Sequence, residues 1–261
     1  MKPPRRIAIS TLGLLLMLSP TAGLKAAELK VIAGGSLTGL FGELGPRFEQ
    51  ASGHKLVIHF DSTPNIISRI TSSTPFDLVV VPVDVFRSAE AKARFTPSPS
   101  IDIARAGYGV IVRAGAPKPD IGTPGALRKT LLEASSIAFV PASAAGSYIT
   151  KMFERLGIGE AMAAKTRPQA APNQIAPAVA KGDAELGIFL TNVLIAPGVE
   201  LAGSFPAELQ QELVFTAAVA VDTKEAGAAR ALIDTSHDKE KEPGVMDEDR
   251  VRNPELAQPP Q

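Results

Sequence analysis

Residues 29–41 read LKVIAGGSLTGLF. The apolar run at 29–33 has the length of a buried strand, and the two glycines after it let the backbone come close to another group. Ser36 and Thr38 follow where a helix begins, and hydroxyl residues are favoured there as N-caps. Because the first N–H groups of a helix lack an acceptor within it and the dipole is positive there, this stretch predicts a cradle for an oxyanion. An ordinary strand-to-helix turn with a capping serine is the alternative interpretation.

The segment before this stretch has the pattern of a secretory signal peptide. A basic start, KPPRR, precedes an apolar core at 7–18 and small or helix-breaking residues at 20–23. The apolar core is too short to span a bilayer as a permanent helix. We therefore predict a signal peptide over residues 1–27, with cleavage between Gly23 and Ala27, and a mature protein in the periplasm.

The composition limits what the mature chain can be. It has no cysteine, so its stability must come from its core, and a lipid anchor on an N-terminal cysteine is excluded. Without the four basic residues of the first 27, the 27 acidic residues outnumber the 23 basic ones that remain. This mildly acidic balance argues against nucleic acid or anionic lipid as a partner. No later run is long enough for stable membrane insertion.

The next fifty residues alternate between strand and helix patterns. We predict a helix at 40–50, a strand at 55–60, a polar turn at 61–64, a helix at 65–71 and a strand at 77–81. This alternation indicates a parallel sheet with helices on both faces. Hydroxyl clusters twice follow the carboxyl end of a strand, which is where open α/β sheets bind ligands.

Beyond residue 81 the sequence continues to alternate between strand and helix patterns, and it contains no internal repeat of fixed period. The run at 213–221 is apolar and long enough to cross between two lobes. The predicted elements are strands at 107–112, 136–140 and 184–190 and helices at 127–133, 147–156, 175–181 and 224–233. Residues 234–261 are polar, charged and proline-bearing, so we expect a disordered tail there.

Catalytic and cofactor motifs fail when their requirements are checked. The stretch 34–38 approaches the G-x-S-x-G elbow, but Thr38 replaces its last glycine, and His54, His59 and His237 are not placed as a serine's base. Three scattered histidines without cysteine do not make a metal site. Dinucleotide and P-loop fingerprints are absent. The sequence therefore predicts no enzyme, no metal and no cofactor.

Several segments together resemble the periplasmic molybdate-binding proteins of ABC transporters. Near the predicted mature N-terminus stands AGGSLT, followed by FDSTPNIISRI and FDLVVV. The likeness continues through AGSY at 145–148 and AVAKGDAELGI at 178–188. No single motif is specific, but their order and spacing are, and they cover most of residues 28–233.

This resemblance implies an α/β fold of the two-lobed type II periplasmic binding protein class. Each lobe would be a mainly parallel sheet flanked by helices, and two crossover strands would join the lobes. Residues 28–105 with 216–233 would form lobe one, and 106–215 would form lobe two.

The resemblance also implies a tetrahedral oxyanion held between the lobes by hydroxyls and backbone N–H groups, without a cation. Ser36 and Thr63 match hydroxyl positions on lobe one, and Ala145 and Gln174 match backbone donors on lobe two. Many members carry a tyrosine after the L-G-I strand, whereas this chain has Leu190 followed by Thr191. We expect Thr191 to replace that contact.

The implied function is capture of a molybdate- or tungstate-like oxyanion by a monomer that delivers it to an ABC permease in the inner membrane. Three alternatives remain open. The same fold could bind another small anion or an organic solute, or it could serve as a sensor without transport. An enzyme would need a proton-transfer residue in the cleft.

Overall fold

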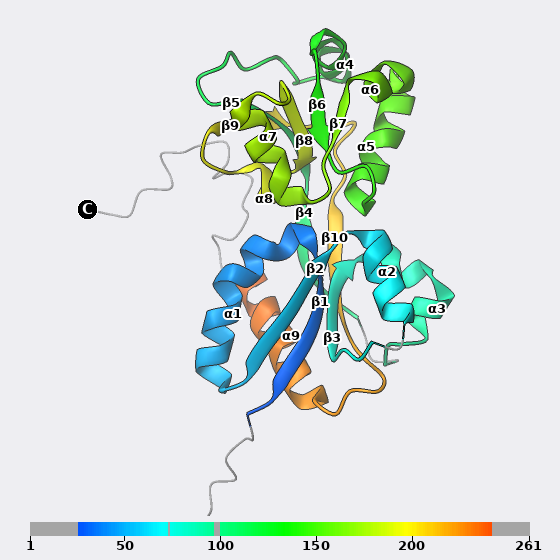
Figure 1. The fold of residues 1–261 in the computed structure, drawn as a ribbon, viewed down its shortest axis with the longest axis vertical. Coiled ribbons are helices and arrows are strands. Elements are labelled where there is room, and N and C mark those ends of the chain that lie inside the picture. Colours follow the sequence, from blue (N-terminus) through cyan, green and yellow to red (C-terminus); the bar gives the residue numbers. More distant parts are fainter. Residues whose placement is uncertain (1–25, 73, 97–99, 242–261) are drawn as a thin grey trace, which may run out of the picture.

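The computed structural model describes residues 26–72, 74–96 and 100–241. These residues form two lobes, each built on a five-stranded sheet flanked by helices (Figure 1). The predicted fold class is confirmed, although each sheet has two parallel and two antiparallel strand pairs rather than being mainly parallel. Most of the predicted signal peptide lies outside the described residues.

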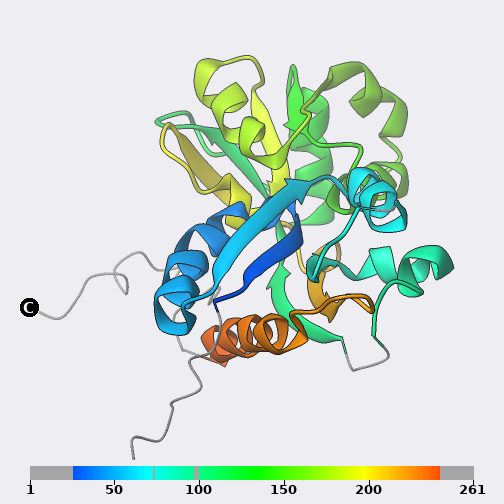
Figure 2. The same cartoon turned by 60° about the horizontal axis from the view of Figure 1, so that its bottom comes forward.

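Lobe one carries the sheet with strand order β2-β1-β3-β10-β4. The first three strands are parallel, and β10 runs antiparallel between β3 and β4. Helices α1 and α9 contact each other on one face, as Figure 2 shows, and α2 and α3 pack on the other. The elements are β1 Glu28–Gly34, η1 Gly35–Leu37, α1 Thr38–Ser52, β2 Lys55–Asp61, α2 Thr63–Thr71, β3 Leu78–Pro82, η2 Val83–Arg87, α3 Ala89–Lys92, β4 Ile101–Ala106, β10 Leu213–Val219 and α9 Ala226–Lys241.

Lobe two carries the sheet with strand order β7-β6-β8-β5-β9. Helices α5 and α6 contact each other on one side, and α7 and α8 do so on the other (Figure 1). The elements are β5 Tyr108–Arg113, α4 Pro124–Glu133, β6 Ile137–Phe139, α5 Ala144–Arg155, α6 Gly159–Lys165, β7 Thr166–Pro168, η3 Pro172–Gln174, α7 Ile175–Lys181, β8 Leu186–Leu190, α8 Thr191–Leu194 and β9 Val199–Ser204.

The chain crosses between the lobes twice. The first crossing leads from β4 directly into β5, and the second leads from β9 into β10. The predicted lobe boundaries, after residues 105 and 215, lie within β4 and β10. The β10–β4 ladder shifts its register between Phe215 and Thr216, which is the point of the second boundary.

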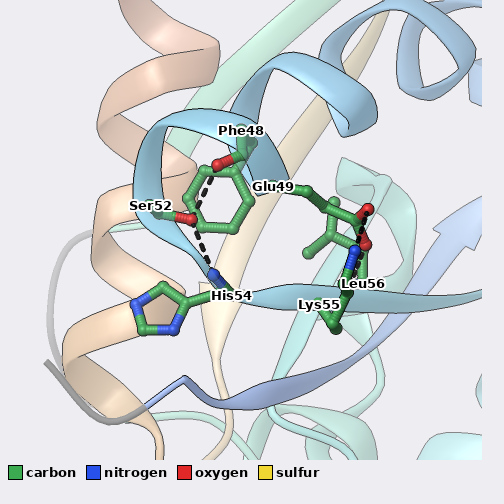
Figure 3. Close-up of polar contacts among 6 residues, drawn as sticks. All are labelled: Phe48, Glu49, Ser52, His54, Lys55 and Leu56. Atoms are coloured by element: carbon green, nitrogen blue, oxygen red, sulfur yellow. Dashed lines mark hydrogen bonds and ion pairs between the residues drawn. The ribbon is translucent and has the colours of Figure 1, made fainter.

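The turn between α1 and β2 is closed by local polar contacts (Figure 3). Gly53 ends α1 with φ at 73°, a left-handed conformation that glycine adopts without steric cost. The Ser52 hydroxyl donates to Phe48 O at 2.7 Å and accepts from His54 N at 3.2 Å. His54 is buried, and its Nδ1 accepts from the N–H of Ala27 at 3.0 Å. The start of β1 is thereby tied to the start of β2.

The carboxylate of Glu49 completes this turn. It accepts from Leu56 N at 2.7 Å and pairs with Lys55 Nζ at 3.2 Å (Figure 3). These contacts hold the start of β2 against α1, and β2 pairs with β1 in a register in which Gly34 lies opposite Asp61. The carboxyl ends of both strands therefore meet at one edge of the sheet, facing lobe two.

Two differences from the predicted elements concern helix ends. Helix α9 continues to Lys241, so residues 234–241 are helical, whereas the sequence placed them in the tail. The remainder of that predicted tail, 242–261, lies outside the described residues. Helix α5 begins at Ala144 rather than at 147, because Ser143 caps it. Within the described ranges, no helix is both long and apolar enough to cross a membrane.

Candidate functional site

A cavity of about 20 Å³ lies between the lobes, where the carboxyl ends of β1, β2 and β3 face the start of α5. It has room for about one water molecule. Its polar lining consists of Ser36, Asp61, Ser62 and Thr63 from lobe one and Ser143 from lobe two. The strand ends that the sequence marked as ligand positions therefore surround one space.

A larger hollow of about 940 Å³ lies along β9 on lobe two. Its lining is mostly apolar, and its two charged residues, Lys118 and Glu200, pair with each other at 3.3 Å. It offers no converging polar groups, so the smaller cavity between the lobes is the better candidate for a binding site.

The glycines of the first loop allow β10 of lobe one and η3 of lobe two to come close. A Cβ on Gly34 would lie 2.9 Å from the ring of Phe215, and one on Gly35 would lie 3.3 Å from Pro172. The next residue, Ser36, contributes its backbone oxygen to an interlobe contact, in which Asn192 Nδ2 donates to it at 2.8 Å. Within the described part of the chain, the structure records no hydrogen bond of the Ser36 hydroxyl.

The second loop places Asp61 and Ser62 directly before α2. Asp61 Oδ1 accepts from Ser62 N and from Asn65 Nδ2, both at 2.7 Å, and its Oδ2 lies 3.3 Å from His59 Nε2. Burial raises the pKa of the Asp61 carboxyl, but the hydrogen bonds from Asn65, Ser62 and His59 outweigh it and bring the pKa below its usual value. Asp61 is therefore a carboxylate at neutral pH. It is the one ionisable side chain among the residues that line this cavity.

On lobe two, the start of α5 faces the cavity. The Ser143 hydroxyl accepts from Gly146 N at 2.9 Å and donates to Val140 O at 2.8 Å. Gly146 lies so close to the preceding strand end that a Cβ there would be 1.9 Å from Val140 O. Ala145, between these residues, is buried and lines the cavity. The first turn of this helix is thus held firmly against the sheet.

The two lobes meet at one predicted site residue, Thr63. Ala144 N, in the first turn of α5, donates to Thr63 Oγ1 at 3.1 Å. A hydroxyl at the start of one helix therefore pairs with an N–H group at the start of another, across the boundary between the lobes.

The structure separates the five predicted ligand residues into two groups. Ser36, Thr63 and Ala145 line the cavity, whereas Gln174 and Thr191 do not. The Gln174 side-chain oxygen accepts from Ala170 N and Ala171 N at 3.0 and 3.3 Å, and the Gln174 backbone N–H donates to Ala171 O at 3.1 Å. Gln174 therefore closes the η3 turn, and it is Pro172 of this turn that lines the cavity.

Thr191 does not line the cavity. It lies next to Gly107, in the first crossing between the lobes, which we call the hinge. Its N–H and its hydroxyl both point to Gly107 O, at 2.9 and 3.4 Å. Leu190, at the position of the expected tyrosine, is fully buried in the core. The expectation that Thr191 replaces the tyrosine contact does not fit this geometry, because its polar groups are occupied by the hinge backbone.

Sequence reasoning missed four polar residues near this site: Asp61, Ser62, Ser143 and Asn192. Asp61 and Ser62 belong to the polar turn predicted at 61–64, from which the resemblance selected only Thr63, and Ser143 directly precedes α5. Asn192 is the second residue after β8, so the rule that ligand groups follow the carboxyl ends of strands marks it together with Thr191 and does not choose between them.

Comparison with known proteins agrees with this fold. A family model of bacterial extracellular solute-binding proteins matches residues 29–240. The chain belongs to that family.

Two relatives within this comparison are molybdate-binding proteins. The molybdate-binding protein ModA of Azotobacter vinelandii is 27% identical over 215 residues, 80% of this chain and 84% of that protein. The solved structure of the periplasmic molybdate-binding protein of that organism aligns with a TM-score of 0.66 at 20% identity, covering 80% of this chain and 92% of that one. The resemblance to periplasmic molybdate-binding proteins is thereby confirmed.

Another relative corrects the prediction that the chain is not an enzyme. A protein named aconitate isomerase from a Pseudomonas species is 30% identical over 263 residues, 97% of this chain and 99% of that protein. A chain similar over nearly its whole length is thus named as an enzyme, and the prediction was wrong to exclude catalysis. That prediction rested on missing nucleophile and metal motifs, which an isomerisation by proton transfer does not require.

Proposed function

We propose that this protein captures a small, multiply charged anion between its lobes and delivers it, as a periplasmic monomer, to an ABC permease. The anion would be an oxyanion of the molybdate and tungstate class or a small carboxylate. One observation carries the proposal: hydroxyls from two loops of lobe one and the first turn of α5 converge on a single cavity.

Hydroxyl groups and helix N-termini, which carry no net charge, are suited to binding an anion. The Ser36 and Ser62 hydroxyls make no recorded hydrogen bond with the described residues, so both can donate to a ligand. The first turns of α2 and α5 add the positive end of a helix dipole. Each such contact contributes about 1 kcal/mol, and several converging on a desolvated anion reach roughly 8 kcal/mol, which corresponds to micromolar affinity.

Binding must involve motion of the lobes. A cavity of about 20 Å³ is smaller than any tetrahedral oxyanion or carboxylate, and the bond from Ala144 to Thr63 closes it. A solute can enter only if the lobes separate at the two crossings and then close again around it. Contacts from both lobes would favour the closed state, because only that state makes all of them.

Isomerisation by proton transfer is a second candidate function, favoured by two observations. The aconitate isomerase relative matches nearly the whole chain, and Asp61 supplies a carboxylate at the cavity. In such a reaction a proton leaves the CH₂ group beside the double bond of an unsaturated tricarboxylate, the double bond shifts, and a proton is added to the former vinyl carbon. No electron acceptor is needed. Asp61 would accept the first proton, since it is ionised at neutral pH.

The experiment that tests both candidates begins with thermal unfolding of the mature protein. The ligands are molybdate, tungstate, sulfate, phosphate, citrate, cis-aconitate and trans-aconitate. The chain has no tryptophan, so a dye or calorimetry reports the transition. A ligand at a hundred times its Kd should add about 2.7 kcal/mol and raise the Tm by several degrees.

Ser36→Ala combined with Thr63→Ala should abolish the shift produced by the ligand that binds. If none of these anions shifts the wild-type Tm, anion capture is refuted. Incubation with cis-aconitate, followed by proton NMR, tests the second candidate, which requires the trans isomer to appear only with the protein present.

A further inference from the structure

Asn192 makes a hydrogen bond between the lobes that the sequence did not predict. Its amide nitrogen donates to Ser36 O at 2.8 Å, joining α8 of lobe two to η1 of lobe one. Because a carbonyl oxygen only accepts, the nitrogen of the amide must face it. The orientation of the amide is therefore fixed, and Oδ1 is the atom that points away from Ser36 O.

Among the described residues, Asn192 Oδ1 has no hydrogen-bond partner. It is buried, and it accepts no hydrogen bond from the described residues. Buried side-chain acceptors are nearly always paired, and leaving one unpaired is unfavourable. With the lobes closed, pairing this oxygen requires a hydrogen-bond donor from outside the described part of the chain.

The position of Asn192 relates this acceptor to the proposed binding site. Ser36 and Phe189 both line the cavity; Asn192 bonds to the first and follows the second by three positions. Its neighbours cannot serve the site, because Leu190 is buried in the core and Thr191 is bonded to Gly107. Asn192 is thus the side chain after β8 that reaches lobe one.

We propose that Asn192 selects the solute: its Nδ2 holds the first loop in the closed state, and its Oδ1 accepts a hydrogen bond from a donor group on the bound anion. The inference rests on the proposed function and narrows it. The preferred anion carries a hydroxyl or an acidic proton, as a hydroxycarboxylate or a hydrogen-bearing oxyanion does. A fully deprotonated oxyanion leaves the acceptor unpaired and binds more weakly.

Two matched pairs of anions test this selection at pH 7. Citrate is compared with tricarballylate, which lacks the hydroxyl, and phosphate, which keeps a proton, is compared with sulfate, which has none. Kd values are measured by calorimetry for the wild type, for Asn192→Ala and for Asn173→Ala, an exposed asparagine nearby that serves as the control. If Asn192→Ala does not fold, Asn192→Ser replaces it.

The wild type should prefer the donor-bearing member of at least one pair about tenfold. Asn192→Ala should bring that ratio close to one, and Asn173→Ala should leave it unchanged. If Asn192→Ala weakens both members of a pair equally, Asn192 only holds the lobes together and the selection is refuted, while anion capture stands. If none of the four anions binds and molybdate does, the selection is also refuted. If no anion binds at all, the proposed function fails with it.

Discussion

The Thr63 hydroxyl in lobe one accepts a 3.1 Å hydrogen bond from Ala144 N in lobe two. Both groups belong to helix starts that would otherwise face the cavity with unpaired polar atoms. In this closed arrangement each satisfies the other. An anion that separates these two groups must replace their hydrogen bond with hydrogen bonds of at least equal strength. The Thr63–Ala144 bond therefore sets part of the protein's affinity for the anion.

Replacing Thr63 by valine keeps the shape of the side chain and removes its hydroxyl. We expect affinity for the bound anion to fall about tenfold, which is about 1.4 kcal/mol, because one donor to the ligand is lost. Calorimetric titration measures the change. Thr71→Val is the matched control, since Thr71 lies on the same helix and its hydroxyl bonds only to helix carbonyls. Equal affinities of Thr63→Val and wild type would contradict the site.

Replacing Asp61 by asparagine separates the two candidate functions. The neutral amide removes a negative charge from the cavity wall, so the affinity for a fully deprotonated oxyanion should rise, by about twofold to tenfold. Any aconitate isomerisation should fall at least about a hundredfold, because the proton acceptor is gone. Titration and NMR on the same preparation measure both effects. Isomerisation at the wild-type rate would remove Asp61 from the mechanism.

Asp61 also predicts how stability depends on pH. Hydrogen bonds hold its folded pKa below the usual value, so its contribution to folding is fully present above the unfolded pKa of about 3.9 and is lost as the pH falls through the folded pKa. Wild type should therefore be more stable than Asp61→Asn at pH 7, and the difference should shrink at pH 3. Melting temperatures at both pH values measure it. A difference that is the same at both pH values would show that the carboxylate gains nothing from its partners.

Gly146 should not tolerate even one methyl group. A Cβ there would lie 1.9 Å from Val140 O, so α5 must move away from the strand end, at a cost of about 1–3 kcal/mol. Thermal unfolding should show a Tm several degrees lower and weaker anion binding. Gly42→Ala is the control, because a Cβ on that helical glycine would meet no atom within 4 Å. Alanine at this position should stabilise the protein by about 0.5–1 kcal/mol. A Gly146→Ala protein as stable as wild type would contradict the packing described.

Among the strands that the sequence identified, two are buried on both faces. Strands β3 and β8 are buried at every position, and their apolar runs are continuous. Strand β4 was missed because its sequence, IDIARA, contains charged residues. In the structure Asp102 accepts from the Thr216 hydroxyl and pairs with Arg105. These side chains satisfy each other at a sheet edge, and no local pattern reveals such a pairing.

The residues of the candidate site also divide into those that the sequence could predict and those that it could not. Ser36 and Thr63 could be predicted because strand ends and helix starts leave a recognisable order of residues. The choice between Thr191 and Asn192 could not, because both are polar and adjacent. Only the folded backbone shows that Thr191 turns to Gly107 while Asn192 reaches Ser36. Contacts between lobes depend on how two separately formed sheets meet, which no short stretch encodes.

The position of β10 has a consequence for how the chain acquires its structure. This strand lies between β3 and β4, yet it follows all of lobe two in the sequence. Lobe two is one continuous segment, so it can form without the rest of the chain. Lobe one cannot complete its sheet until residues beyond 213 are available, and its β3–β10 contacts span more than a hundred positions. Such long-range pairing slows folding, so lobe two should form first and lobe one last, with β10 joining its two halves in the final step.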